Sequence, residues 1–299
     1  MDRILEYSSD AVEALLKMDS RRKYLIIEDC KGKGYYYSLF SQILEEDENQ
    51  ILRIIPLGGK EKVKEFYKEK RENYKNLCYL VDMDYDDFLD IEKVEDDSFF
   101  YLKKYTLENY FVSEKVGEVL LCNRLNLDPI SSKDKLQYEN WKNFIEKEYK
   151  SLIASFLTVR ELKMGVSCIK EGATQYFSIS RCLRNCPQGK NCIDNENKQL
   201  KCSKNIKKYY KVIKTKAIEK NINRSQFHEI FFKHKTSIEN YSDIFSLVPG
   251  KHLTNLYSFY LQNFCGSINE TIVKEIGIQK CPDLLVILSS IKEKLFKTV

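Results

Sequence analysis

The chain has 299 residues, of which 43% are hydrophobic and 31% are charged, and its formal net charge is +5. This length suits one large domain or two smaller ones. The composition is that of a soluble globular protein and excludes an intrinsically disordered chain. No apolar run approaches the roughly 18 residues of a membrane-spanning helix, and the charged N-terminus lacks a signal-peptide core. We therefore expect a cytoplasmic protein with no membrane association.

Strand and helix patterns alternate through the first 112 residues. Such alternation is typical of a parallel sheet with helices on its faces. From residue 113 onward the apolar spacing becomes helical, and Leu127–Ser132 is the best candidate for a linker. We predict an α/β protein with a parallel-sheet domain over 1–112 and a mainly helical, basic region over 113–299. The predicted helices of the first domain span 9–18, 35–44 and 61–74, and its predicted strands span 24–28, 51–57, 77–82 and 99–102.

An apolar run from Leu77 leads directly into four aspartates, which are Asp82, Asp84, Asp86 and Asp87. Alternation along an extended chain predicts that the first three lie on one side. Clustered carboxylates at the end of a buried strand repel each other and need a cation, and hard oxygen ligands suit Mg²⁺ or Mn²⁺. The stretch therefore predicts a metal site, with an acidic surface loop as the alternative.

Polar groups also follow the two preceding predicted strands. Glu28 ends the first strand, and Gly58-Gly59-Lys60 follows the second. Ligands gather at the carboxyl ends of parallel strands, so we expect Glu28, Lys60 and Asp82 at one edge of the sheet. Two glycines at a helix start let backbone N–H groups approach a phosphate that Lys60 neutralises, although the same motif also serves as an ordinary helix-opening turn.

Five motifs follow one another along the chain, four of them within residues 24–111 and the last further towards the C-terminus. They are Glu28 with Tyr35-Tyr36, Gly58-Gly59-Lys60, Asp82-x-Asp84-x-Asp86, Glu108-Asn109-Tyr110 and Pro249-Gly250-Lys251. In this order they resemble the motifs of a Toprim-like nuclease family found beside ABC-type ATPases. The family is related to nucleases of the overcoming-lysogenization-defect type and includes the AriB-type nuclease subunit of the PARIS anti-phage system.

The resemblance implies a metal-dependent nuclease effector of anti-phage defence, controlled by a partner ABC-type ATPase. Its substrate would be nucleic acid, either RNA such as tRNA or DNA, and a homodimer is left open. The alternative is a non-catalytic Toprim-like module that binds nucleic acid or protein. The implied catalytic residues are Glu28, Asp82, Asp84 and Lys60, the implied Mg²⁺ or Mn²⁺ ligands are Glu28, Asp82, Asp84 and Asp86, and Glu108 and Lys251 would support the site.

The chain departs from the family pattern at the end of the first strand. Family members often have Glu-Gly there and an aspartate about four residues later, whereas this chain has Glu28-Asp29 followed by Cys30-Lys31-Gly32. Two interpretations follow: Asp29 stands in for the missing acid, or the site has one acid fewer.

Four of the ten cysteines lie within 21 residues, over 182–202. In a reducing compartment a tight cysteine cluster indicates metal before it indicates disulfides. We predict a Cys₄ zinc site, with free thiols or an iron–sulfur cluster as the alternatives. The predicted Zn²⁺ ligands are Cys182, Cys186, Cys192 and Cys202.

The charge is distributed unevenly along the chain. Residues 1–112 carry a net charge of −7 and residues 113–299 carry +12, with 16 Lys and Arg against 5 Asp and Glu over 170–235. This asymmetry suits an enzyme that holds metal in one part and a polyanion in the other. Lysines at helical spacing are predicted to contact phosphates, with a solvated helix face as the alternative. They are Lys204, Lys207, Lys208, Lys211 and Lys214.

Overall fold

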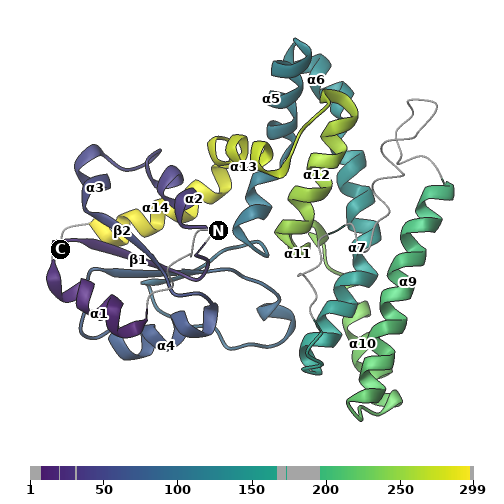
Figure 1. Cartoon of the computed structure of the whole chain (residues 1–299), viewed down its shortest axis with the longest axis horizontal. Helices are drawn as coiled ribbons and strands as arrows, with labels where there is room; N and C mark the ends of the chain where they lie inside the picture. The colour runs from purple at the N-terminus through teal and green to yellow at the C-terminus, as the bar shows by residue number, and fades with distance from the viewer. Residues whose placement is uncertain (1–7, 20, 31, 167–172, 174–195, 297–299) are drawn as a thin grey trace. The chain divides into compact units, whose positions relative to one another are not determined.

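The computed structural model describes residues 8–19, 21–30, 32–166, 173 and 196–296 (Figure 1). The chain divides into two compact units. Unit 1 comprises Met1–Met83, Glu92–Tyr110 and Ile278–Val299, and unit 2 comprises Asp84–Ile91 and Phe111–Gly277. This division differs from the sequence-based boundary at residue 112 in two places, because 84–91 group with the helices and the C-terminal segment groups with the sheet.

Unit 1 is built on a sheet of four parallel strands in the order β2-β1-β3-β4. In the register of the sheet, Leu25 pairs with Ile54 on one side and with Cys78 on the other. The α/β class with a parallel sheet is therefore confirmed. The strands are β1 (Lys23–Ile27), β2 (Leu52–Pro56), β3 (Leu77–Val81) and β4 (Phe99–Tyr101).

Helices cover both faces of this sheet (Figure 1). One face carries α1 (Ser9–Met18) and α4 (Lys60–Lys70), and their apolar residues share a core with Tyr24, Ile26 and Tyr79 of the strands. The other face carries α2, α3 and α14. All five residues of β3 are buried, as expected for a strand covered on both faces. The helices of this second face are α2 (Lys33–Phe40), α3 (Glu46–Ile51) and α14 (Pro282–Phe296).

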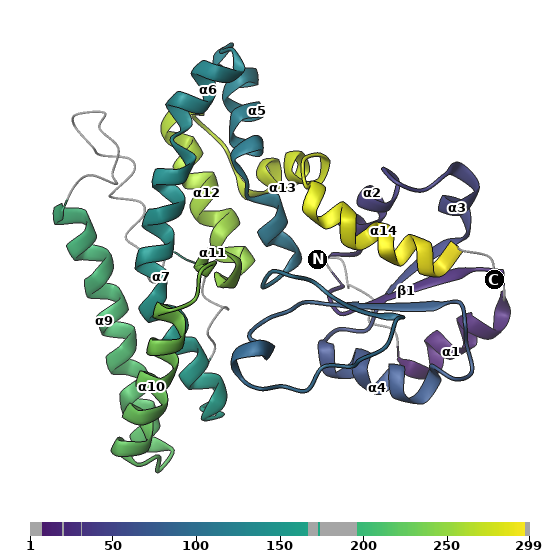
Figure 2. The ribbon, with the colours of Figure 1, turned by 180° about the vertical axis from the view of Figure 1, so that it is seen from behind.

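The C-terminal helix α14 packs against β1 and β3, as the view from behind shows (Figure 2). Polar contacts fix it to the segment that precedes β2. The Lys292 amine lies 2.9 Å from a Glu48 carboxylate oxygen and donates to the Ile43 carbonyl at 2.8 Å. The last helix of the chain is therefore part of the sheet unit. Its buried residues are Leu284, Ile287, Leu288, Ile291 and Leu295.

The described residues of unit 2 form helices joined by turns and short connections. Its long helix α7 packs against α9, α10 and α11, and the Trp141 ring packs against the Tyr257 ring of α12 at a tilt of 39°, with centroids 4.8 Å apart. None of the described helices is both long enough and apolar enough to cross a membrane. The helices are α5 (Glu114–Leu125), α6 (Pro129–Leu136), α7 (Tyr138–Glu161), α9 (Glu196–Glu219), α10 (Arg224–Glu239), α11 (Ile244–Leu247), α12 (Gly250–Cys265) and α13 (Glu270–Gln279).

The predicted linker over Leu127–Ser132 is wrong, because this stretch begins α6. Asp128 is the N-cap, and its carboxylate accepts from the backbone N–H groups of Ile130 and Ser131 at 3.0 Å each. Pro129 occupies the first helical position, where a missing N–H group costs nothing. The Asp-Pro pair is therefore a helix start.

The core of unit 2 contains a titratable side chain, His252 on α12, which is completely buried. Burial lowers the pKa of His252 from 6.5 to about 4. The folded protein therefore keeps the imidazole neutral in a pH range where the unfolded chain takes up a proton. We expect the contribution of His252 to the free energy of unfolding to be fully present above pH 6.5 and to fall by about 3 kcal/mol as the pH approaches 4.

Chemical unfolding at a series of pH values measures this effect. A His252→Phe variant, which keeps an aromatic ring beside Tyr149 and Phe156, should lose that part of the pH dependence. If the free energy of unfolding depends on pH equally in wild type and variant, His252 is not the source of this dependence.

Candidate active site at the carboxyl edge of the sheet

The strand order reverses between β1 and β3. The chain passes from β1 to β2 on one side of β1, and from β3 to β4 on the opposite side of β3. Ligands of open α/β sheets bind outside the carboxyl ends of the strands at such a reversal, because the two connections leave in opposite directions and open a crevice. Glu28 follows β1, and Asp82 follows β3. The topology therefore places both predicted acids at this point.

Glu28 and Asp82 are in contact. The backbone N–H of Asp82 donates to Glu28 Oε2 at 3.4 Å, and both side chains are half-buried. The Glu28 carbonyl accepts from the N–H of Gly58 at 2.9 Å, which ties the end of β2 to the same place. The predicted convergence of these strand ends is thus present within unit 1.

Lys60 reaches towards the residue after Asp82. Gly58 has a φ of 79° and Gly59 has a φ of 146°, and residues with a side chain are strained at such angles. This turn lets α4 begin at Lys60, whose amine donates to the Met83 carbonyl at 3.3 Å. A cation therefore lies beside the chain that carries Asp82, and the phosphate-binding role of Lys60 stays a prediction.

A tyrosine hydroxyl lies among the acids of this site. Tyr36 on α2 is buried, and burial raises its pKa well above the usual range. The charges of Asp82, Glu28 and Glu108 raise the pKa of Tyr36 further, so all three carboxylates lie near enough for their charges to act on its hydroxyl. The sequence indicated Tyr36 only as half of a Tyr-Tyr motif, so its place in the site was missed.

Glu108 lies in the short helix η2 (Leu107–Phe111), and its carboxylate accepts from the Thr106 hydroxyl at 2.9 Å. In the same turn, Tyr110 is buried, and burial raises its pKa to about 12. The Tyr110 hydroxyl accepts from the backbone N–H of Lys103 at 2.8 Å. Glu108 is thus held by its own turn at a position from which its charge acts on Tyr36.

The remaining aspartates do not continue β3 as an extended chain, and that prediction is wrong. The strand ends at Val81, Asp84 has a left-handed φ of 52°, and Asp86 begins the short helix η1 (Asp86–Phe88). Asp84 and Asp86 both belong to unit 2, where Asp86 is only 3% exposed. Strand alternation fails here because the chain turns directly after Asp82.

No three His, Cys, Asp or Glu side chains of the described residues form a group arranged to hold a metal ion. Of the predicted ligands, Glu28 and Asp82 are joined within unit 1 by the hydrogen bond from the Asp82 N–H to the Glu28 carboxylate. Mg²⁺ is usually bound through one or two carboxylates, while water and substrate phosphates fill its other positions. Glu28 and Asp82 are donors of the kind that such a cation takes, and Glu28, Asp82, Asp84 and Asp86 all remain predictions as ligands.

The other predicted site residues belong to unit 2 or lie outside the described residues. Lys251 lies in the first turn of α12 and is exposed. Cys182, Cys186 and Cys192 lie outside the described residues, as does the side chain of Cys202 on α9, so the zinc site remains a prediction.

The predicted phosphate-binding lysines all belong to α9. Lys207, Lys208 and Lys211 are exposed, and Lys214 is half-exposed. The side chain of Lys204 lies outside the described residues.

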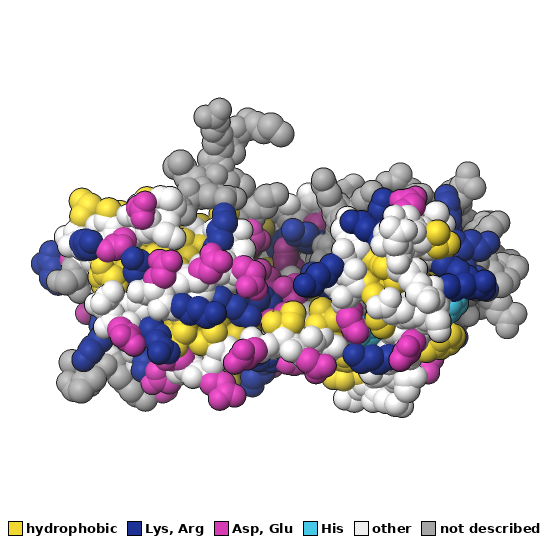
Figure 3. All heavy atoms as spheres, turned by 90° about the horizontal axis from the view of Figure 1, so that it is seen from below, with side chains coloured by type: hydrophobic (Ala, Val, Ile, Leu, Met, Phe, Trp, Pro, Cys, Tyr) yellow, Lys and Arg dark blue, Asp and Glu magenta, His cyan; other side chains and the backbone are white. Residues whose placement is uncertain are grey.

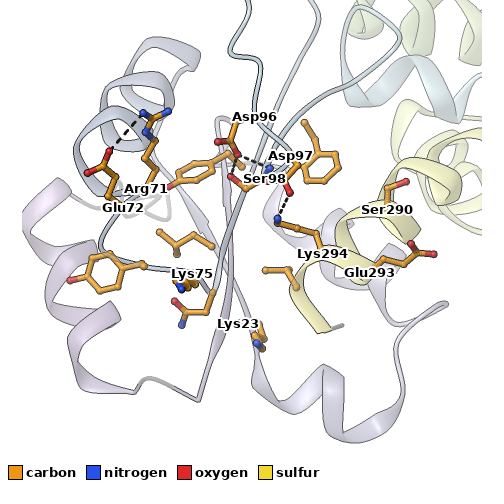
Figure 4. Close-up of a pocket in the computed structure, with 16 residues that line it drawn as sticks. Lys23, Arg71, Glu72, Lys75, Asp96, Asp97, Ser98, Ser290, Glu293 and Lys294 are labelled. Atoms are coloured by element: carbon orange, nitrogen blue, oxygen red, sulfur yellow. Dashed lines mark hydrogen bonds and ion pairs between the residues drawn. The ribbon is translucent and has the colours of Figure 1, made fainter. Parts of the chain in front are cut away.

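A groove of about 1040 Å³ lies at the opposite edge of the sheet (Figure 4). Lys23 and Leu77, the first residues of β1 and β3, line it together with the end of α14. Its charges are partly paired, because Lys294 contacts Asp97 and Arg71 lies 3.8 Å from Glu72. This groove is at the amino ends of the strands, so it is not the place where Glu28 and Asp82 meet.

No known protein-family model matches the chain, and no curated protein matches it.

Glu28 and Asp82 place two acids at neighbouring strand ends, and their like charges disfavour the metal-free site. Glu28→Gln removes one charge but keeps an oxygen that can accept from the Asp82 N–H. We expect the metal-free variant to unfold at a higher temperature than the wild type, because the repulsion is relieved. Mn²⁺ at about 100 times its dissociation constant should stabilise the wild type by about 2.7 kcal/mol and the variant by much less.

Thermal unfolding with and without Mn²⁺ checks both effects. The control is Glu65→Gln, which removes an exposed acid from α4 in the same unit. A response to Mn²⁺ that is the same in wild type and Glu28→Gln would exclude Glu28 as a ligand.

Proposed function

We propose that the chain is a metal-dependent nuclease whose catalytic unit is the Toprim-like unit 1. The observation that carries this proposal is the meeting of Glu28 and Asp82 at the reversal of strand order, with the Lys60 amine 3.3 Å from the Met83 carbonyl. Carboxylates for a divalent cation and an amine for a phosphate are the groups that phosphodiester cleavage requires.

Each group has a distinct role in this reaction. A divalent cation, when bound, supplies activation of water and neutralisation of the phosphate charge. Glu28 and Asp82 would hold that cation. Lys60 would bind a phosphate oxygen, and the start of α4 would present backbone N–H groups to it, because Gly58 and Gly59 leave the approach open.

The helix α9 supports nucleic acid as the substrate class. One face of α9 packs into unit 2 through Tyr209 and Ile213, while Lys207 and Lys211 are exposed. Lys and Arg side chains gather at the end of unit 2 formed by α9 and α10 (Figure 3). Over α1 and α4 of unit 1, by contrast, positively and negatively charged side chains are interspersed. A surface on which positive charges predominate supplies affinity for phosphates without reading sequence.

The biological setting is proposed from the family resemblance alone. In that setting the chain is an effector of anti-phage defence, and a partner ABC-type ATPase holds it silent or delivers it. Its substrate would then be RNA such as tRNA, or DNA, and the experiment below tests both.

Cleavage is tested with the full chain, alone and together with any ABC-type ATPase encoded beside it. We expect Mg²⁺- or Mn²⁺-dependent breaks in cellular RNA or DNA, detected by sequencing of 5′ ends. Glu28→Gln, Asp82→Asn and Lys60→Ala should each lower the cleavage rate by about 100-fold or more while remaining folded, because each removes a group needed in the transition state.

The control for these variants is Lys68→Ala, which removes an exposed lysine from α4 without altering the site. Metal-dependent cleavage that persists in Glu28→Gln and Asp82→Asn would contradict the catalytic assignment. No cleavage of either nucleic acid by the wild type with its partner would favour a binding module instead.

Binding by α9 is tested through its salt dependence. Replacing Lys207, Lys208 and Lys211 together by Gln should weaken binding to duplex nucleic acid, and the slope of log affinity against log salt should fall by about 0.9 for each lost phosphate contact. Lys216→Gln is the matched control, because Lys216 lies on the same helix but pairs with Glu219 at 2.7 Å. An unchanged slope in the triple variant would exclude this face of α9.

A further inference from the structure

Five aromatic rings of α9 and α10 form a connected group within unit 2. The Tyr210 ring of α9 lies against two rings of α10, Phe227 and Phe231, with centroids 5.9 Å and 4.7 Å apart. The Phe231 ring meets the Phe232 ring edge-on at 5.7 Å. The Phe232 ring stacks on His228 at 6.3 Å, with 22° between the two planes. We call these five residues the ring cluster, and its members support one another across both helices.

The ring cluster has a buried side and an exposed side. Phe227 and Phe231 are buried, whereas Tyr210 and His228 are half-buried and Phe232 is 54% exposed. His228 and Phe232 lie four residues apart in α10, so they share one face of that helix. A lone exposed apolar side chain needs no explanation, but Phe232 continues a group of rings that holds it in place. The cluster therefore presents aromatic surface to solvent on a fixed base.

Positive charges flank the ring cluster on α9. Residues 206–218 contain five lysines and no acid. Lys207 lies three residues before Tyr210 and Lys214 four residues after it, so both lie on the face of α9 that carries this ring. Neither lysine forms an ion pair with an acid of the described residues. The α9 side of the cluster is thus positively charged.

A positive charge also flanks the ring cluster on α10. Arg224 lies four residues before His228, on the same face of the helix. Burial raises the pKa of Tyr210, and the charge of Arg224 opposes this shift, so Arg224 lies near the Tyr210 hydroxyl. Glu229, three residues before Phe232, is the one acid over 220–238. Figure 3 shows hydrophobic and histidine side chains beside the Lys and Arg side chains at this end of unit 2.

Aromatic surface between cations is complementary to a nucleic-acid strand with unpaired bases. Every base has a flat face that stacks on an aromatic ring, while Lys and Arg side chains follow the phosphates between the bases. A duplex keeps its base faces inside its own stack, so it can use the cations but not the rings. A purely apolar partner would use the rings but not the cations.

We propose that the exposed side of the ring cluster binds unpaired bases of nucleic acid by stacking, with Phe232 as the main stacking residue. Lys207, Lys214 and Arg224 bind phosphates on either side of it. The site lies entirely within unit 2. The inference deepens the proposed function and rests on it, because it adds unpaired bases to the phosphates as the part of the substrate that unit 2 recognises.

The test is fluorescence anisotropy with the full chain and a labelled strand of about 12 nucleotides, as DNA and as RNA, alone and annealed to its complement. Phe232→Ala should weaken single-strand binding about 10-fold and duplex binding by less than about twofold, because only unpaired bases can stack. The slope of log affinity against log salt should stay unchanged in this variant, because Phe232 contacts no phosphate.

Three further variants separate stacking from apolar contact. Phe232→Leu keeps an apolar side chain without a ring and should weaken single-strand binding as Phe232→Ala does. Phe232→Trp keeps a ring and should retain binding, and its added indole should lose fluorescence when a single strand binds, since the one native tryptophan, Trp141, is buried. The control is Ile130→Ala, which removes an apolar side chain that is 75% exposed on α6 and should change neither affinity. Circular dichroism establishes that each variant is folded.

A stacking effect with the RNA strand or with the DNA strand supports the proposal. Unchanged single-strand binding in Phe232→Ala, or equal weakening of single-strand and duplex binding, would overturn the stacking site and favour a protein partner for these rings. The proposed function would then keep its acids and its lysine surface. If the wild type binds neither strand nor duplex, nucleic acid as the substrate class is itself contradicted, and the stacking site falls with it.

Discussion

The reversal of strand order between β1 and β3 is the constraint on which the rest of the candidate site depends. It brings the ends of two neighbouring strands together without a covering connection, and each of these ends is followed by an acid. Like charges at neighbouring strand ends disfavour folding in the absence of a cation. The apolar strands beneath offset that cost: β3 is buried along its whole length, and helices cover it on both faces. The site is thus held by its scaffold, as preorganised sites generally are.

The two units divide the chemistry in the proposed reaction. Unit 1 carries the carboxylates, the buried Tyr36 hydroxyl and Lys60, and unit 2 carries the exposed lysines of α9. A catalytic centre needs fixed geometry, which a sheet with a two-sided core provides. A surface that binds phosphates needs only charge of one sign, and a helix packed along one face supplies it. The segment 84–91 is the exception, since it follows the strand that ends at Val81 but is held by aromatic and ionic contacts of the helical unit.

The sheet and its polar edge could be predicted because alternating strands and helices leave few topologies, and the carboxyl ends of parallel strands meet at one edge. Glu28, Lys60 and Asp82 followed directly from that rule. Asp84 did not, because aspartate tolerates both extended and left-handed backbone, and an alternating pattern does not show where a strand stops. The N-cap role of Asp128 was not predicted, because the Asp128-Pro129 pair was interpreted as part of a linker. The packing of α14 on the sheet could not be predicted either, because helical spacing shows which side of a helix is apolar but not which surface that side covers.

That position of α14 bears on how the protein is made. The helix covers β1 and β3, yet the ribosome completes it only after the whole of 111–277 has emerged, since chains are synthesised from the N-terminus. Until then one apolar face of the sheet lacks the part of its cover that α14 supplies, while the strands that precede Glu28 and Asp82 are already outside the exit tunnel. The sheet unit is therefore completed only when nearly all of 1–299 has been translated, and it is this unit that carries the acids proposed to bind metal. In the proposed function, this order of assembly would delay activity until translation of these residues is complete.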